Sequence, residues 1–123
     1  MVGPRMRVAW AGDSLEKLSK FSAEAQLQLG QDLDRVQRGQ EPLDSGSMGS
    51  ALPHVFELRD EDKDFWYRLF YIQIENKIYV LDCIKKKTNQ TSQADMERSR
   101  GRLKAIKQEL AEQAKEAKRA KKK

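Results

Sequence analysis

The chain has a single cysteine, Cys83, and a single histidine, His54, among its 123 residues. One cysteine excludes a disulfide within the chain and a paired-cysteine metal site, and one histidine leaves little for a histidine-based zinc site. No apolar run approaches the length of a membrane-spanning helix, and the first residues lack the apolar core of a secretory signal. We therefore expect a one-domain cytoplasmic protein with no metal, no small-molecule cofactor and no membrane association.

Positive charge is scarce in the first two thirds of the chain and concentrated in the last third. Residues 1–83 carry 10 lysines and arginines against 14 acidic residues, whereas residues 84–123 carry 14 against 5. The excess begins at three consecutive lysines, Lys85, Lys86 and Lys87. Such asymmetry favours a polyanionic partner, most often a nucleic acid, over a basic helix that is merely solvated.

The apolar pattern predicts an α+β fold. Residues 6–12 predict a short strand, and residues 13–38 predict two helices that begin at the capping residues Asp13 and Ser22. After a Pro- and Gly-containing loop at 40–53, three strands at 54–59, 65–74 and 78–84 are separated by short polar turns, which predicts antiparallel pairing. We expect a small antiparallel sheet packed against the N-terminal helical hairpin and a C-terminal helix at 92–110.

The basic end of the chain has little apolar content beyond Leu110. Residues 111–123 offer only alanine to a core, so the domain is expected to span 1–110, and 111–123 to form a helical or frayed basic tail.

Arg68 is the residue that fits a buried strand least well, because it stands among the aromatic residues of 65–74. A buried charge needs a partner or an open face. Glu57 on the adjacent strand is a candidate structural partner; alternatively, Arg68 faces a cleft where Arg59 and the lysine triplet converge. The sequence alone leaves both possibilities open.

A cluster of arginine and lysine without paired histidines suits RNA cleavage. RNA carries its own nucleophile, the 2′-hydroxyl, so an enzyme need only align it with the phosphorus and stabilise the charge of the transition state. Guanidinium and ammonium groups supply that stabilisation without a metal ion.

Three segments in order, VFELR (55–59), WYRLFY (66–71) and IYVLDCIKKKTNQTS (78–92), resemble the HigB-like toxins of the RelE superfamily. The resemblance implies a RelE-like fold and the toxin of a type II toxin–antitoxin module, which cleaves mRNA on the ribosome without a metal. It also implies a helix-turn-helix antitoxin as partner.

The resemblance assigns roles residue by residue. Arg59, Arg68, Lys86 and Lys87 fall on the motifs that carry the chemistry, with Glu57 as a structural partner. Lys85 is expected on the opposite face of its strand, and with Arg98 and Arg102 it is expected to contact RNA. The general base is open, because no histidine or tyrosine follows residue 79; His54 and Tyr71 are chemical substitutes for proton transfer.

Two other functions are compatible with the sequence. One is a catalytically inactive protein of the same fold that binds RNA or ribosomes through its basic C-terminal third. The other is an interaction protein whose basic helix binds an acidic partner.

Overall fold

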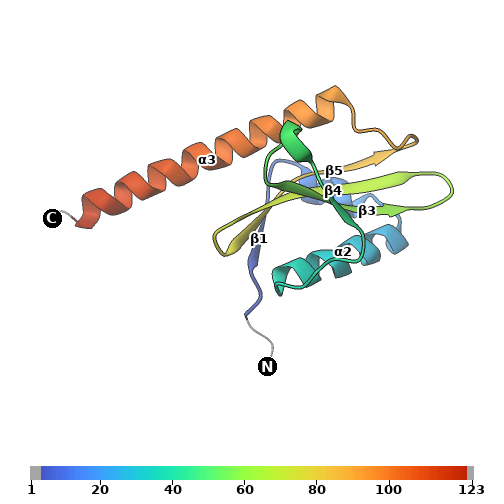
Figure 1. Ribbon diagram of the computed structural model, residues 1–123, viewed down its shortest axis with the longest axis horizontal. Coiled ribbons are helices and arrows are strands. Elements are labelled where there is room, and N and C mark those ends of the chain that lie inside the picture. Colours follow the sequence, from blue (N-terminus) through green and yellow to red (C-terminus); the bar gives the residue numbers. More distant parts are fainter. Residues whose placement is uncertain (1–3, 122–123) are drawn as a thin grey trace.

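A computed structural model describes residues 4–121, which form one β-sheet with helices on both faces (Figure 1). The elements are, in chain order, β1 (Arg7–Trp10), α1 (Ser14–Ser19), α2 (Ala23–Gln37), β2 (Ser45–Ser47), the 3-10 helix η1 (Gly49–Ala51), β3 (Val55–Glu61), β4 (Trp66–Ile74), β5 (Lys77–Lys86) and α3 (Gln93–Lys121). The α+β class is as the sequence predicts. None of the helices in this described part is long and apolar enough to cross a membrane.

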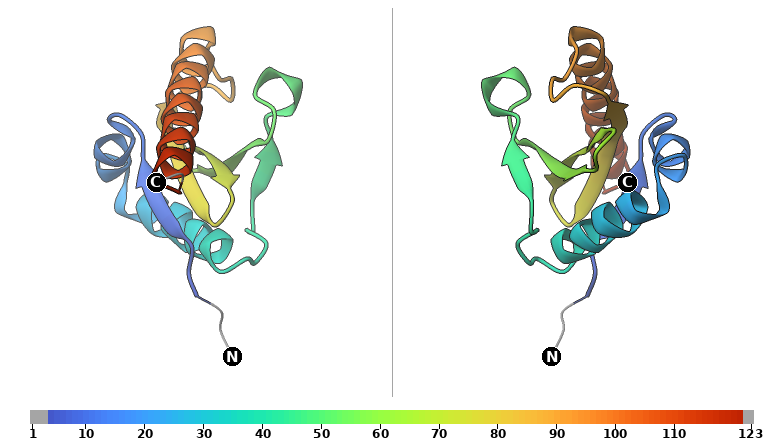
Figure 2. Two further views of the ribbon diagram at one scale, coloured as in Figure 1. Left: turned by 90° about the vertical axis from the view of Figure 1, so that its left-hand side faces the viewer. Right: turned by 90° about the vertical axis from the view of Figure 1, so that its right-hand side faces the viewer.

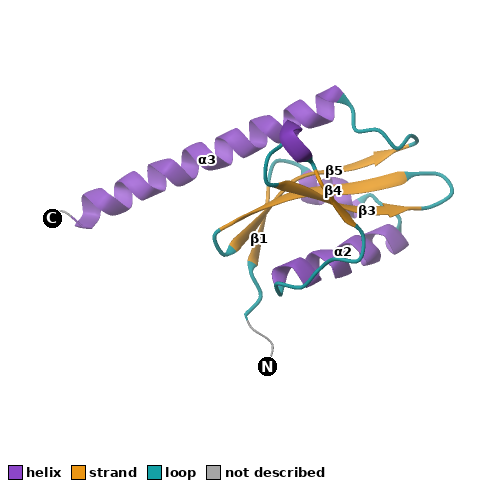
Figure 3. Cartoon of the chain, viewed as in Figure 1, coloured by secondary structure: helices purple, strands orange, loops and turns teal. Residues whose placement is uncertain are grey.

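The sheet has five strands in the order β1-β5-β4-β3-β2 (Figure 3). Strands β3, β4 and β5 form the expected antiparallel meander. The prediction of a wholly antiparallel sheet is wrong, because β1 pairs with β5 in parallel, with Arg7 opposite Lys77. A parallel pair requires a long connection that crosses the sheet, and here the chain between the two strands includes the helices α1 and α2. The pairing joins residues 70 positions apart, which no local pattern specifies.

The predicted loop at 40–53 contains two short elements. Residues Ser45–Ser47 add β2 to the edge of β3 in antiparallel orientation, and η1 follows directly. The side chains of this Gly- and Ser-rich segment give no strand pattern in the sequence. The strand forms because its backbone groups hydrogen-bond with those of β3. This strand borders the candidate site described below, where Gly46 lies against the Arg59 side chain.

Both faces of the sheet are buried, each against different helices (Figure 2). On one face, Leu58, Leu69 and Val80 pack against the apolar stripe of α2, which includes Leu29 and Leu33. The opposite face carries a second cluster that packs under α3, with Leu52, Val55, Phe70, Ile72, Leu81, Ile84 and Leu103. Because successive strand residues point to opposite faces, burial on both sides explains why β4 and β5 are apolar almost throughout.

Helix α3 begins with a side-chain cap and extends well beyond the sheet (Figure 1). The Ser92 hydroxyl accepts a hydrogen bond from the Asp95 backbone N–H at 3.1 Å and donates to the Asp95 carboxylate at 2.7 Å. The apolar side chains of this helix, Met96, Leu103 and Ile106, pack in the second cluster against the sheet. From residue 111 to 121 every side chain is exposed, and the helix continues without interruption.

Candidate functional site

Arg59 and Arg68 lie directly opposite each other on the neighbouring strands β3 and β4. Two like charges in this register repel unless a counter-charge lies between them. Glu57 provides it: its Oε1 is 2.9 Å from Nε of Arg59 and 3.5 Å from a terminal nitrogen of Arg68. Arg68 therefore pairs with Glu57, as the first alternative predicts, and it also lies beside Arg59. The predicted convergence with the lysine triplet is met only in part, because Lys85 lies on the other face of the sheet.

Arg68 has two further neighbours that orient its guanidinium. It donates a hydrogen bond to the side-chain oxygen of Asn89, in the segment between β5 and α3. Its guanidinium carbon lies 5.9 Å from the centre of the Trp66 ring, within the range of a cation–π contact. Only 11% of the Arg68 side chain is exposed, so the guanidinium is held in one orientation.

A small pocket of about 180 Å³ opens beside the two arginines. Gly46 of β2 makes room for Arg59, because a Cβ at that position would collide with the guanidinium. The pocket is lined by Asp44, Arg59, Asp60, Glu61, Trp66, Arg68 and Asn89, and we call these seven residues the arginine pocket. Two guanidinium forks at one opening can bind an anion such as a phosphate, which the neighbouring carboxylates would partly oppose.

Asp60 is the arginine-pocket residue with a perturbed protonation equilibrium. Its partial burial raises the pKa of the carboxyl group, and the nearby carboxylates of Asp62 and Asp44 act in the same direction, against a hydrogen bond from the backbone. A carboxylate with a raised pKa accepts a proton more readily than an ordinary one. Sequence reasoning missed Asp60 because an acidic residue near a turn gives no signal of burial.

The three lysines diverge. Ile84 of β5 lies opposite Arg68 of β4, and Lys86 is on the same face of β5 as Ile84. Lys86 and Arg68 therefore lie on the same face of the sheet. Its ammonium is 2.8 Å from the Asp95 carboxylate of α3. Lys85 lies on the other face, as predicted, with its ammonium 4.5 Å from the centre of the Phe65 ring. Lys87 follows the end of β5 and is exposed.

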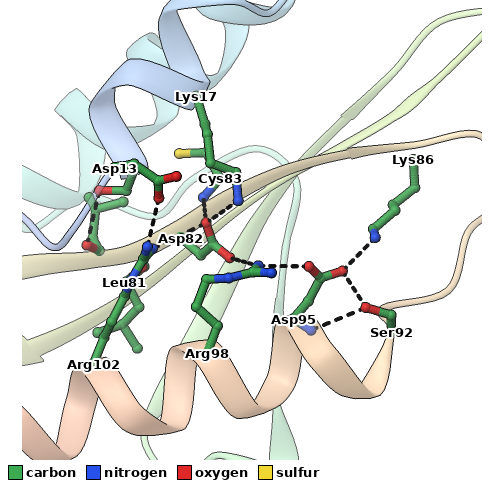
Figure 4. A network of polar contacts seen from close by, with 12 residues as sticks. Asp13, Lys17, Leu81, Asp82, Cys83, Lys86, Ser92, Asp95, Arg98 and Arg102 are labelled. Carbon is green, nitrogen blue, oxygen red and sulfur yellow. Dashed lines mark hydrogen bonds and ion pairs between the residues drawn. The ribbon is translucent and has the colours of Figure 1, made fainter.

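A network of ion pairs joins α1, β5 and the first three turns of α3 (Figure 4). Its centre is Asp82, which is fully buried. The carboxylate lies 2.6 Å from Lys17, 2.9 Å from Arg98 and 3.3 Å from Arg102, and it also accepts the Cys83 backbone N–H at 2.9 Å. The network explains how an aspartate side chain is accommodated in the core.

Arg98 and Arg102, the predicted RNA-binding arginines of α3, both have internal partners. Arg98 bridges Asp82 and Asp95, and the hydrogen bonds that it donates to these two carboxylates raise its pKa. Arg102 binds Asp13 at 2.6 Å and donates to the Leu81 carbonyl at 2.8 Å. The geometry gives these side chains a structural task, and their contact with RNA stays a prediction.

Asp95 connects the network to Lys86. Burial alone would raise the pKa of this carboxyl group, but hydrogen bonds from Lys86, Ser92 and Arg98 bring it down to about 2. The carboxylate is therefore charged throughout the physiological range. A phosphate that binds Lys86 must share the ammonium with Asp95.

The two candidates for proton transfer lie away from the arginine pocket. His54 is exposed and adopts a positive φ of 67° immediately before β3, whereas Arg59 lies towards the other end of that strand. Tyr71 packs on the α2 face with its ring stacked on Phe56 at 6.0 Å, and burial raises the pKa of its hydroxyl. The structure does not bring either residue to Arg68, so their catalytic role stays a prediction without geometric support.

Comparison with known proteins places the chain in a family. Residues 16–104 match the family model described as Phage derived protein Gp49-like (DUF891). The chain belongs to this family, a toxin-like family related to RelE- and HigB-type toxins. The match covers most of the sheet, α1, α2 and the first part of α3, including the arginine pocket and the Asp82 network. No curated protein and no solved structure matches the chain.

Proposed function

We propose that the chain is the toxin of a type II toxin–antitoxin module and acts as a metal-independent endoribonuclease on mRNA at the ribosome. Membership in the Gp49-like family supports a toxin-like protein. The observation that carries the enzymatic part is the arginine pocket, where Arg59 and Arg68 present two guanidinium groups at one opening and are bridged by Glu57. The proposal includes a helix-turn-helix antitoxin as partner and a cytoplasmic location.

The reaction is an in-line displacement at phosphorus. The 2′-oxygen of the substrate forms a bond to the adjacent phosphorus while the bond from phosphorus to the 5′-oxygen breaks. The products are a 2′,3′-cyclic phosphate and a free 5′-hydroxyl, and no water is consumed. Arg68 and Arg59 stabilise the negative charge that accumulates on the non-bridging oxygens of the transition state.

Two proton transfers complete the reaction. A base must take the proton of the 2′-hydroxyl, and an acid must give one to the departing 5′-oxygen. Glu57 is already bound by both arginines, so it serves mainly to orient them. Asp60 has a raised pKa, but it alternates with Arg59 along β3, so its side chain belongs to the face of Leu58. Glu61 shares the Arg59 face and lines the same pocket, which makes it the better-placed carboxylate for the first transfer.

Lys86 supplies a third positive charge on the same face of the sheet. Its ammonium is bound to Asp95, which fixes the side chain near the beginning of α3. A scissile phosphate that enters the pocket would share Lys86 with Asp95, while Lys87, exposed at the end of β5, is free to contact the flanking backbone.

The same geometry also favours a second candidate, an RNA- or ribosome-binding protein without catalytic activity. Arg68 is occupied by Glu57 and Asn89, and Lys86 is occupied by Asp95. A site whose cations are all paired internally binds anions less strongly than one whose cations are free. The two candidates therefore differ in one measurable property, cleavage.

A cleavage assay with translating ribosomes separates the candidates. Wild-type protein, Arg68→Ala and the control Arg38→Ala are incubated with ribosomes and a reporter mRNA, and new 5′ ends are mapped by primer extension. Arg38 follows α2 as its C-cap residue and pairs with Asp34, away from the pocket, so this variant controls for the loss of an arginine outside the site. Cleavage by the wild type and the Arg38 variant, with a loss of about 10²–10³ in rate for Arg68→Ala, supports the enzyme. Ribosome binding without any cleavage supports the inactive protein.

A further inference from the structure

The cations of α3 separate onto two sides of the helix. Arg98 and Arg102 point to the side of Asp82 and Asp13, where they are bound by carboxylates. Arg100 points the other way and donates to the Ala51 carbonyl of η1 at 3.1 Å. Both arginines on the first side have charged partners, so a ligand would meet the unpaired cations of α3 elsewhere on the helix, among them those of the second side.

Five basic residues line that second side, and we call them the basic stripe: Arg100, Lys104, Lys107, Lys115 and Lys118. At about 100° per residue they fall within an arc of about 80°, and they extend for about 27 Å along the helix axis. Of the acidic residues of the same helix segment, Glu109 and Glu116 fall on the opposite side, and Glu112 lies between the two sides, near Lys115. The basic and acidic side chains of this segment are therefore concentrated on different sides of the helix, although its total charge gives no sign of this.

The stripe is accessible and largely unpaired. Its five members are all exposed, and an open groove of about 440 Å³ runs along Arg100, Leu103, Lys104, Lys107, Gln108 and Ala111. Within residues 4–121, the only carboxylate within ion-pair distance of a stripe residue is Glu112, 3.7 Å from Lys115. Four of the five cations therefore have no carboxylate partner within residues 4–121.

We propose that the basic stripe binds the phosphate backbone of double-helical RNA. A straight, rigid row of cations on one side matches a regular row of phosphates, and double-helical RNA is recognised mainly through its shape and backbone. Single-stranded RNA is usually held by aromatic residues on which its bases stack, and residues 93–121 contain no aromatic residue. A protein partner would require an apolar centre to its interface, whereas beyond Leu110 the helix offers only alanine.

The stripe adds to the proposed function a second RNA contact that is separate from the arginine pocket. The pocket lies beside Asn89, before α3 begins, and the stripe starts two turns into the helix. The inference rests on the proposed function only in taking RNA as the polyanion. A structured RNA held by the stripe positions the protein, while the pocket performs the chemistry on a flexible strand.

The test compares two double variants that remove the same charge. Lys104→Gln/Lys107→Gln removes two stripe cations, and Arg7→Gln/Lys20→Gln removes two exposed cations of β1 and the end of α1. Binding to a fluorescein-labelled RNA duplex is measured by anisotropy over a range of salt concentrations, with circular dichroism to verify the fold. We expect the stripe variant to bind several-fold more weakly and its slope of log affinity against log salt to become shallower by about 1.8, while the control keeps the wild-type slope.

Three results would overturn the inference. Equal losses in both variants would show that only net charge matters. Unchanged duplex binding combined with lost binding to polyglutamate would identify an acidic protein as the ligand. A single strand bound as tightly as the duplex, with the same loss in the stripe variant, would exclude the preference for a double helix. None of these measurements depends on cleavage, so an inactive pocket leaves the test of the stripe intact.

Discussion

Asp82 is the residue whose replacement should affect the stability of the fold most. The substitution Asp82→Asn keeps the shape of the side chain but removes the charge that faces Lys17, Arg98 and Arg102. Loss of one partner of a buried ion pair costs about 3–5 kcal/mol, because the remaining charge is left uncompensated. Here the three cations remain partly exposed, at 28%, 38% and 19%, so water recovers part of that cost. We expect a decrease of about 3 kcal/mol in the free energy of unfolding.

Thermal and urea unfolding followed by circular dichroism measure this decrease. For a chain of this length, 3 kcal/mol corresponds to a lowering of the melting temperature by about 10 °C. Lys17→Met is the matched comparison, because it removes one of three cations and leaves the carboxylate with two; it should cost about 1 kcal/mol. If Asp82→Asn unfolds within about 0.5 kcal/mol of the wild type, the network does not hold α1, β5 and α3 together, and the reasoning is refuted.

Three further outcomes follow from the buried polar groups and the tail. Ser99→Ala should be neutral or slightly stabilising in a thermal melt, since the Ser99 hydroxyl is buried without a hydrogen-bond partner among the described residues; a loss above about 1 kcal/mol would contradict this. The pKa of Asp95 is lowered to about 2, so its charged carboxylate stabilises the fold. This stabilisation is complete above the ordinary aspartate range and is lost as pH falls through about 2. Asp95→Asn should therefore make stability depend less steeply on pH below about pH 4, and an unchanged acid profile would count against this. Truncation after Leu110 should shift the melting temperature by less than about 3 °C, since residues 111–121 are exposed, whereas a large drop would show that they support the core.

The elements that are defined by local pattern could be predicted from the sequence. The meander depends on apolar strands separated by short polar turns. The cap of α2 also follows from sequence, since the Ser22 hydroxyl accepts the Ala25 N–H at 3.1 Å. These features are local in the chain, so a short window of residues specifies them.

Features that join distant segments could not be predicted. Asp13 was expected to cap α1, yet its side chain makes no cap hydrogen bond and instead binds Arg102, 89 residues away. Lys86 falls on the expected motif. Its ion pair with Asp95 forms only because the segment after β5 places the beginning of α3 beside the end of that strand. Arg98 and Arg102 are basic residues of a basic helix, and only the position of Asp82 under that helix shows that their charges are already neutralised.

The chemistry of the RNA ends produced on the ribosome tests the central proposal most directly. The wild-type protein is incubated with translating ribosomes, and the 3′ ends of the upstream mRNA fragments are examined. Attack by the 2′-hydroxyl, with Arg59 and Arg68 stabilising the transition state, predicts a 2′,3′-cyclic phosphate upstream and a 5′-hydroxyl downstream. A downstream 5′-phosphate would instead require an attacking water, and it would contradict the account.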